Sequence, residues 1–438
     1  MRPLPFPLLA EERLDNSAAL VVARRPGIPL VAVRLVLSVG AALDPAGGHG
    51  TAHLTAISCR RGTRRLGGLA LDRAVESLGS ELGSGSDEDA SFFGLSAPSE
   101  HLPRLLQLVT QVVTEPAFPA GEVERLRRRE LAGLRHLLDE PGAVADRALL
   151  RTVHGDHPYG HPADGTAAHL RRLSRASVAA YHRRWYGPGV ATLVVVGDVP
   201  EAATLARGRR LLSRWRSAAD TPPLLTPPRR APRRVVVVDR PDLTQTQVRI
   251  GVAALPRRTP DYFAATVANA AFGGGFTSRL VQAIRVDRGL SYGVRSRFSM
   301  SRAGGMFYVS SFTRNDAAAE LLEVAFAEAR RFADEGPTPE ELDRARAWLA
   351  GTHPLSLETH EQVAERIADL RLYGLEVAEV TGYADRVQAV TAEDCRRVAR
   401  AHFPGDDGAV VAVGPARLLQ KSLARFGPVE VLSPGRAV

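Results

Sequence analysis

The chain has 438 residues, of which 45% are hydrophobic and 24% charged, a balance that excludes disordered and collagen-like proteins. This length exceeds a single hydrophobic core and predicts two domains of about 200 residues each. The formal net charge is +9, and nearly all of the basic residues are arginine, Lys421 being the only lysine. Charge alone would suit a nucleic-acid partner, but no zinc finger or aromatic-rich strand motif accompanies it, so we expect no nucleic-acid binding.

The start of the chain and its two cysteines bear on location. The segment MRPLPFPLLAEERLDN reaches prolines and acidic residues before an apolar signal core can form, and no apolar run is long enough to cross a bilayer. Cys59 and Cys395 lie in different halves without metal-type spacing, so neither a disulfide framework nor a cysteine zinc site is indicated. We expect a soluble, cytoplasmic protein with no membrane partner.

The first half of the chain reads as strands and helices in alternation. Apolar residues alternate over 31–39, which predicts a half-buried strand, and they recur at helical spacing over 102–113, which predicts an amphipathic helix that covers it. A short buried strand follows at 193–196. The second half repeats this order, with strands at 235–238, 248–254 and 410–413 and a helix at 317–332.

Two sequence matches between the halves indicate a duplication. The segment that begins at Glu122 resembles the one at Glu340, and the segment that begins at Leu173 resembles the one at Val390, so the offsets are 218 and 217 residues. Five prolines between Arg216 and Arg234 favour an extended linker. We therefore predict an N-terminal domain over 1–215, a Pro-rich linker over 216–234 and a C-terminal domain over 235–438. The expected fold class is α+β, with two homologous domains that each have an antiparallel or mixed sheet covered on one side by helices.

The segment GTAHLTAI, residues 50–57, is similar to the HxxEH motif of zinc proteases, in which two histidines bind the metal and a glutamate activates water. Here His53 stands at the first position, but Ala56 replaces the glutamate and Ile57 replaces the second histidine. Neither replacement can bind a metal or accept a proton. We expect this degenerate motif to hold no metal. The alternative is that His53 is an ordinary histidine near the start of a helix.

Three segments together resemble the pitrilysin/insulinase (inverzincin) family of metallopeptidases, in its small bacterial branch built from two different subunits. They are GTAHLTAI, GDHPYGHP at 155–162 and GGGFTSRLVQAIRVDRGLSYG at 273–293. The resemblance extends over about residues 14–425. It implies that one subunit binds zinc, while the other lacks the zinc motif and donates an Arg and a Tyr, seven residues apart, to the shared site. Those positions match Arg285 and Tyr292 here.

The resemblance also implies where zinc lies. Active chains supply a third ligand, a glutamate some 75 to 80 residues after the motif; the matching residue here is Glu130, which we interpret as an ion-pairing residue on a helix surface among arginines. No cofactor is then expected in this chain, and zinc is expected in a homologous partner subunit with an intact HxxEH motif.

The residues around Arg285 make the predicted role chemically reasonable. We expect a helix from Thr277 to a left-handed Gly289, and a strand that begins at Tyr292. A guanidinium and a phenol can both donate to a peptide carbonyl and to the oxyanion formed when it is attacked. The alternative is that Arg285 caps its own helix and Tyr292 packs in the sheet.

Two other groups of residues were weighed. Gly273, Gly274 and Gly275 could cradle a phosphate, but no Lys-Ser or Lys-Thr follows, so we predict that they bind substrate by close backbone approach or act as a hinge. The histidines His154, His157 and His161 have spacing that could suit a metal, but their HPYG core favours a tight structural turn.

These observations predict the non-zinc subunit of a heterodimeric zinc metalloendopeptidase that cleaves short or unfolded peptides, such as leader or pro-peptides, and that is inactive alone. The alternative is a catalytically inert structural or chaperone-like peptide-binding subunit of the same fold.

Overall fold

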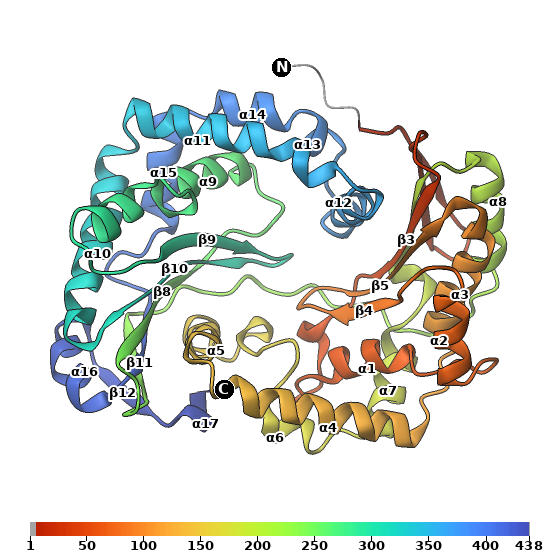
Figure 1. The fold of residues 1–438 in the computed structure, drawn as a ribbon, viewed down its shortest axis with the longest axis horizontal. Coiled ribbons are helices and arrows are strands. Elements are labelled where there is room, and N and C mark those ends of the chain that lie inside the picture. Colours follow the sequence, from red (N-terminus) through yellow and green to blue (C-terminus); the bar gives the residue numbers. More distant parts are fainter. Residues whose placement is uncertain (1–5, 438) are drawn as a thin grey trace. The chain divides into compact units, whose positions relative to one another are not determined.

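The computed structural model describes residues 6–437, which form two compact units (Figure 1). Unit 1 contains the described part of 1–134 together with 162–224 and 354–381, and unit 2 contains 135–161, 225–353 and 382–437. Each unit is built on one six-stranded mixed sheet. The α+β class with two similar domains is therefore confirmed.

The sheet of unit 1 has the strand order β1-β2-β6-β3-β5-β4. Strands β2 and β6 pair in parallel, and all other neighbours are antiparallel. The strands are β1 (Leu9–Arg13), β2 (Ala19–Arg24), β3 (Leu30–Leu37), β4 (Gly83–Ser86), β5 (Ser91–Pro98) and β6 (Ala191–Gly197). The central strand β6 is buried along almost its whole length and has an unbroken apolar run over 193–196, because both of its faces are covered.

The sheet of unit 2 has the order β12-β7-β11-β8-β10-β9. Its strands are β7 (Arg234–Asp239), β8 (Gln245–Ala254), β9 (Val294–Met300), β10 (Gly305–Arg314), β11 (Ala409–Gly414) and β12 (Val429–Leu432). Strands β7 and β11 pair in parallel, as β2 and β6 do in unit 1, and the next three neighbours are antiparallel in both sheets. The shared topology supports the predicted duplication.

Helix caps repeat at the same interval. In unit 1, Ser174 and Ser177 form a reciprocal capping box at the start of α7 (Arg175–Trp185). In unit 2, Thr391 and Asp394 do the same for α15 (Ala392–His402). The two caps lie 217 residues apart, the offset of the sequence match. Each cap satisfies backbone N–H groups that a helix leaves unpaired in its first turn.

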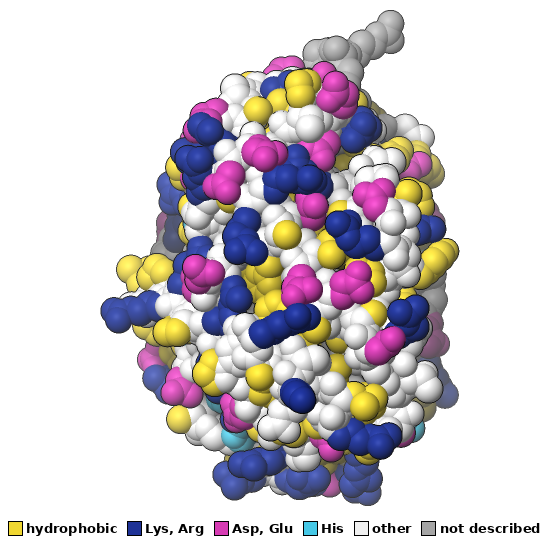
Figure 2. Space-filling model, turned by 90° about the vertical axis from the view of Figure 1, so that its left-hand side faces the viewer, with side chains coloured by type: hydrophobic (Ala, Val, Ile, Leu, Met, Phe, Trp, Pro, Cys, Tyr) yellow, Lys and Arg dark blue, Asp and Glu magenta, His cyan; other side chains and the backbone are white. Residues whose placement is uncertain are grey.

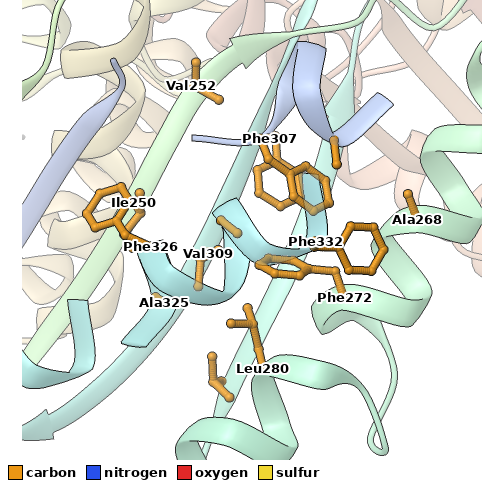
Figure 3. Close-up of a cluster of buried hydrophobic side chains, with 14 of the residues drawn as sticks. Ile250, Val252, Ala268, Phe272, Leu280, Phe307, Val309, Ala325, Phe326 and Phe332 are labelled. Atoms are coloured by element: carbon orange, nitrogen blue, oxygen red, sulfur yellow. The ribbon is translucent and has the colours of Figure 1, made fainter. Parts of the chain in front are cut away.

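One face of each sheet packs on helices from its own half of the chain. In unit 1, α1 (Thr51–Cys59), α3 (Leu102–Thr114) and α8 (Glu201–Leu212) contact the strands. In unit 2, the core helices include α9 (Tyr262–Asn269), α10 (Ala318–Glu335), α11 (Pro339–Thr352), α15 and α16 (Ala416–Leu423). Phe272, Phe307 of β10 and Phe332 pack together in this core (Figure 3), with the ring centroid of Phe272 6.1 Å from that of Phe307 and 5.5 Å from that of Phe332.

The other face of each sheet carries a helix from the opposite half of the chain. Helix α5 (Pro141–His154) packs on β8 and β11 of unit 2, and α12 (His360–Leu372) packs on β3 and β6 of unit 1. The predicted domains 1–215 and 235–438 therefore need correction, because 135–161 and 354–381 change sides. The expectation of helices on one side only is also incomplete. An amphipathic pattern shows that a helix covers a sheet but not which sheet it covers.

The predicted linker has no helix and no strand over 216–231, and an isolated bridge joins Pro232 to Asp407 before β7 begins. The other α-helices of the described chain are α2 (Gly68–Glu76), α4 (Ala120–Leu137), α6 (Ala167–Leu170), α13 (Ala378–Thr381), α14 (Tyr383–Ala389) and α17 (Pro434–Ala437). Over residues 6–437, no helix has the length and apolar character needed to cross a membrane.

Candidate functional site

The segment that leads to Arg285 is wound as π-helix in two places. Helix α9 continues into a π-helical turn over Ala270–Gly274, and a second π-helical stretch spans Val281–Val286. The expected helix from Thr277 to Gly289 is shorter and only partly α-helical, because it spans 279–286 and ends at Val286. Gly289 follows three residues later and is left-handed as predicted, with a φ of 59°. Single π-turns inside helices are frequent at functional sites.

Space explains the three consecutive glycines. A Cβ on Gly273 would lie 2.6 Å from Ser296 Oγ, and a Cβ on Gly274 would lie 2.6 Å from Nδ2 of Asn269 and 3.0 Å from its carbonyl oxygen. A Cβ on Gly275 would lie 3.2 Å from the Ala270 carbonyl oxygen. The turn therefore admits no side chain at 273 or 274 without a shift of its neighbours. Their role in substrate binding stays a prediction.

A buried ion pair anchors this segment to the helical layer. Arg279 donates through Nε to Glu341 at 2.9 Å and through Nη2 to the carbonyl of Gly336 at 2.9 Å, and its guanidinium lies 4.7 Å from the ring centroid of Phe332. Burial raises the pKa of Glu341, but the hydrogen bonds from Arg279 and the Thr338 backbone, together with the positive charges of Arg279 and Arg344, more than offset this, so the pKa lies below its ordinary value. The start of the second π-helical stretch is thereby fixed on α10 and α11.

Arg285 is held between two exposed aromatic rings. Its Cζ lies 4.6 Å from the ring centroid of Tyr292 and 4.9 Å from that of Phe276. These rings are 78% and 76% exposed, the highest values for aromatic side chains in the described chain, and the adjacent Val286 is 62% exposed. Within residues 6–437, no carboxylate forms an ion pair with Arg285. Exposed apolar groups gathered around a cation are typical of a binding surface.

Hydroxyl groups fix the backbone on both sides of Tyr292. Ser311 donates to the carbonyl of Gly293 at 2.9 Å, and Thr313 donates to the carbonyl of Leu290 at 2.6 Å. Ser291 accepts from the N–H of Gly293 at 3.1 Å and closes the turn. The side chain of Tyr292 is thus presented to solvent from a rigid turn two residues before β9, so it neither packs in the sheet nor starts the strand.

Arg285 also does not cap its helix. Arg288 takes that part, because its Nη1 donates to the carbonyl of Ala283 at 3.0 Å. The structure therefore brings Arg285 and Tyr292 together as a free donor pair. It adds Phe276, which the sequence analysis missed, although its place directly after three glycines was a signal of an exposed tip.

A pocket of ≈ 220 Å³ lies beside Phe276. Its lining includes Trp348 of α11, which is 49% exposed, and Ser278, whose buried Oγ has no hydrogen-bond partner within the described part of the chain. The charged side chains of Glu341 and Arg344 also line it, so the pocket is of mixed polarity.

The degenerate zinc motif lies in unit 1, on α1. Asp44 holds the start of this helix by accepting from the N–H groups of Gly50 at 2.6 Å and Ala52 at 2.7 Å. Burial raises the pKa of Asp44 to about 7, against these backbone donors, which lower it. Ala56 and Ile57 are buried at 0% and 7% exposure and offer only carbon atoms.

His53 lies beside one residue of a type that can bind zinc, Glu130. Its Nε2 lies 3.5 Å from Oε2 of Glu130 on α4, and the hydrogen bond from His53, helped by Arg129, holds the pKa of Glu130 below its ordinary value. Glu130 therefore pairs with an arginine, as expected, but it also faces the interior at 20% exposure. Two ligands of one tetrahedral zinc lie about 3.4 Å apart when each bond is about 2.1 Å.

The His53–Glu130 pair is thus two thirds of a zinc-ligand set, without the third ligand and without the base. In the region that the structure describes, no three or more His, Cys, Asp or Glu side chains are grouped to hold a metal. A residue that activates water would have to replace Ala56, whose methyl group can neither polarise water nor accept its proton.

The histidines of the HPYG turn have structural contacts. His157 Nδ1 accepts from the N–H of Tyr159 at 3.0 Å, and its Nε2 lies 2.8 Å from the carbonyl oxygen of Thr226. The hydroxyl of Tyr159 accepts from the N–H of Ala303 at 3.1 Å. Burial lowers the pKa of His154 to about 4, which favours its neutral form. These contacts agree with a tight turn.

The arginine-rich helix α4 carries its own neutralising charges. Arg125 pairs with Glu122 at 2.6 Å and Arg127 with Glu124 at 2.7 Å. On the side of α10 and α16, basic and acidic side chains are interspersed (Figure 2). Neither surface is a continuous basic groove of the kind that follows a nucleic-acid backbone.

Two solved structures match the chain over nearly its full length. The peptidase M16 inactive domain of Pseudomonas fluorescens is 25% identical, with a TM-score of 0.88, and the match covers 93% of this chain and 98% of that one. A protease of Helicobacter pylori, 19% identical, has the same fold with a TM-score of 0.88 and covers 94% and 100%. The fold is thus the two-domain fold of M16 peptidases.

Sequence comparisons give the family. Residues 20–167 match the family model Insulinase (Peptidase family M16), and residues 172–349 match Peptidase M16 inactive domain. An uncharacterized zinc protease of Streptomyces coelicolor is 25% identical over 414 residues, which cover 93% of this chain and 90% of that protein. One of Mycobacterium bovis is 26% identical and covers 94% of both. The chain belongs to the insulinase (M16) family and is of its inactive type.

Proposed function

We propose that this chain is the non-zinc subunit of a heterodimeric zinc metalloendopeptidase that cleaves short or unfolded peptides, leader or pro-peptides among them. The partner is a homologous subunit with an intact HxxEH motif, which binds the zinc. Arg285 and Tyr292 donate to the carbonyl of the scissile peptide and to the oxyanion that forms on it. We propose a cytoplasmic location, which cell fractionation tests.

The contrast between the two units supports this proposal. In unit 1, His53 and Glu130 lack the third ligand and the base of a zinc peptidase. In unit 2, Arg285 is free of carboxylates and is oriented by Phe276 and Tyr292. A chain with two preorganised donors and no nucleophile of its own suits a site whose metal is supplied from elsewhere.

The chemistry of each donor differs. The guanidinium is a cation that offers several N–H groups in a plane, so it can hold a carbonyl oxygen and a neighbouring backbone oxygen at once. The phenol offers one O–H. The hydrogen bonds from both donors become stronger as negative charge develops on the carbonyl oxygen. They therefore stabilise the transition state more than the bound peptide, and the barrier to cleavage falls.

The test is reconstitution. The chain is purified alone and together with its co-purifying homologue, and each preparation is assayed for zinc content and for cleavage of unstructured fluorogenic peptides. We expect cleavage only by the pair, with one zinc per heterodimer. Stoichiometric zinc and peptide cleavage by this chain alone would overturn the proposal. A pair that binds peptides but whose cleavage is indifferent to Arg285 and Tyr292 would instead favour the inert peptide-binding role.

A further inference from the structure

The outermost strand of unit 2 presents unpaired arginines. Strand β9 lies at the end of the strand order and pairs on one side only, with β10 (Figure 1). Its side chains alternate: Val294 and Ser296 are buried on the side of the helical core, whereas Arg295, Arg297 and Ser299 are exposed on the other face. An edge strand of this kind leaves one row of backbone donors and acceptors free to pair with another chain.

The three neighbouring strands at this edge carry no negative charge. Strands β8, β9 and β10 include four arginines and no aspartate or glutamate. Opposite Arg295 and Arg297 in the register stand Ser310 and Tyr308. Arg295 Nε lies 3.4 Å from Ser310 Oγ, which is a neutral hydroxyl.

Three other arginines of unit 2 pair with carboxylates. On β8, Arg249 pairs with Asp146 of α5 at 2.6 Å; at the end of β10, Arg314 pairs with Asp316 at 3.3 Å. On the helical side, Arg425 pairs with Glu323 at 2.7 Å. By contrast, no carboxylate among residues 6–437 pairs with Arg295 or Arg297. Strand β9 and the segment just before it thus carry three arginines, Arg285, Arg295 and Arg297, that have no carboxylate partner in the described chain.

The spacing of these residues fits an extended peptide. Residues i and i+2 of a strand lie on one face, about 6.6 Å apart, so Arg295 and Arg297 face two alternate side chains of a strand paired beside them. From Tyr292 to Arg297 the chain advances five residues, or about 16 Å if it is fully extended. A peptide that leaves the site of cleavage along β9 reaches Arg295 about three residues away and Arg297 about five residues away.

We infer that β9 selects peptides with acidic side chains at two alternate positions on one side of the cleaved bond, which Arg295 and Arg297 bind. The inference rests on the proposed function and names its substrate class. Guanidinium and carboxylate groups match in shape and can form two parallel hydrogen bonds, so a carboxylate meets each arginine better than a neutral or basic side chain does.

The experiment uses peptides with one cleavable centre and two variable positions, occupied by glutamate, glutamine or lysine, three and five residues to either side. With the wild-type heterodimer we expect kcat/KM for the glutamate peptide to exceed that for the glutamine peptide by about 10-fold on one side, and to fall towards it in high salt. Arg295→Gln with Arg297→Gln should abolish this preference. Arg295→Glu with Arg297→Glu should transfer it to the lysine peptide.

The matched control is Arg425→Gln, a paired arginine on the helical side, which should keep the preference for glutamate. Circular dichroism checks that each variant is folded. The inference would be overturned if the wild-type heterodimer cleaved the glutamate, glutamine and lysine peptides with equal kcat/KM. It would also be overturned if the preference for glutamate survived both double substitutions.

Binding separates this inference from the proposed function. If no pair cleaves peptides, fluorescence anisotropy of the labelled glutamate peptide with this chain alone still tests β9: we expect binding that is at least 10-fold weaker in the Arg295→Gln, Arg297→Gln chain. A single-stranded oligonucleotide that binds more tightly and displaces the peptide would assign the arginines to nucleic acid and refute the inference.

Discussion

The ring of Tyr292 lies against the guanidinium of Arg285, with 4.6 Å between Cζ and the ring centroid. Each side chain orients the other, because the cation is attracted to the face of the ring while the hydroxyl and the N–H groups stay free. The ring of Phe276 also lies 4.9 Å from this guanidinium, and Tyr292 and Phe276 are both exposed to solvent.

Loss of either donor should lower turnover of the heterodimer. We expect Arg285→Ala and Tyr292→Phe each to reduce kcat by roughly 100-fold with a smaller change in KM, since an oxyanion donor acts mainly in the transition state. Steady-state kinetics with an unstructured peptide measure both constants. Unchanged kcat in both variants would refute the assignment.

Phe276→Ala separates positioning from chemistry. The substitution removes one aromatic ring beside Arg285 but no hydrogen-bond donor. We therefore expect kcat to fall by about 10-fold, which is less than in Arg285→Ala. Phe276→Leu, which keeps an apolar contact without the π-face, should reduce kcat less than Phe276→Ala does. A Phe276→Ala variant as inactive as Arg285→Ala would make Phe276 a direct substrate contact.

Zinc binding should be restorable in unit 1. Ile57 lies one helical turn after His53, so Ile57→His places a second imidazole on the same face of α1, beside Glu130. We expect the Ala56→Glu, Ile57→His variant to bind about one zinc per chain. Metal analysis of the purified chain measures this, and the same variant with Glu130→Gln is the control, which should bind zinc much more weakly. No zinc in the restored variant would mean that α1 and α4 no longer hold ligand geometry.

The buried pair of Arg279 and Glu341 should be costly to break and less costly to replace. Arg279→Met leaves an uncompensated carboxylate at 13% exposure, and we expect a loss of about 3–5 kcal/mol in unfolding free energy. Adding Glu341→Leu should recover part of this loss, because it removes the stranded charge. Denaturant unfolding of both variants measures the difference. If the double variant were less stable than Arg279→Met alone, the cost would not come from leaving the charge of Glu341 buried and unpaired.

Acid should destabilise unit 2 through His154. Burial lowers its pKa in the folded protein to about 4, while an unfolded histidine takes up a proton below about 6.5. Between these values only the unfolded state is protonated, so stability falls as pH drops from about 6.5 to about 4, by up to about 3 kcal/mol. His154→Phe should lose less stability over this range than the wild type, as measured by denaturant unfolding at several pH values. His101→Phe, at a half-exposed site, is the control and should follow the wild type.

Local patterns predicted most of the elements of the fold. The alternation over 31–39 corresponds to β3, the helical spacing over 102–113 to α3, and the two sequence offsets to a shared sheet topology. What these patterns could not predict is long-range pairing. The apolar faces of α5 and α12 are equally suited to either sheet, so their exchange between the halves leaves no local trace.

The candidate site was predicted in part. Spacing and family resemblance pointed to Arg285 and Tyr292, and the structure brings them into contact. The contribution of Phe276 and the π-helical winding of Val281–Val286 were missed, because both depend on a hydrogen-bond register that a sequence of helix-forming residues does not display. Glu130 was assigned to the surface because arginines flank it, whereas its contact with His53 crosses from α4 to α1.

The exchange of α5 and α12 has a consequence for how the molecule withstands damage. A protease that cut the proline-rich segment 216–231 would divide the backbone into two fragments, yet each fragment would still have one helix docked under the sheet of the other. The two fragments should therefore remain associated and elute together in size-exclusion chromatography until a denaturant is added. For the same reason, either fragment expressed by itself would expose the apolar face of its sheet and aggregate. The two fragments should be soluble only when they are co-expressed.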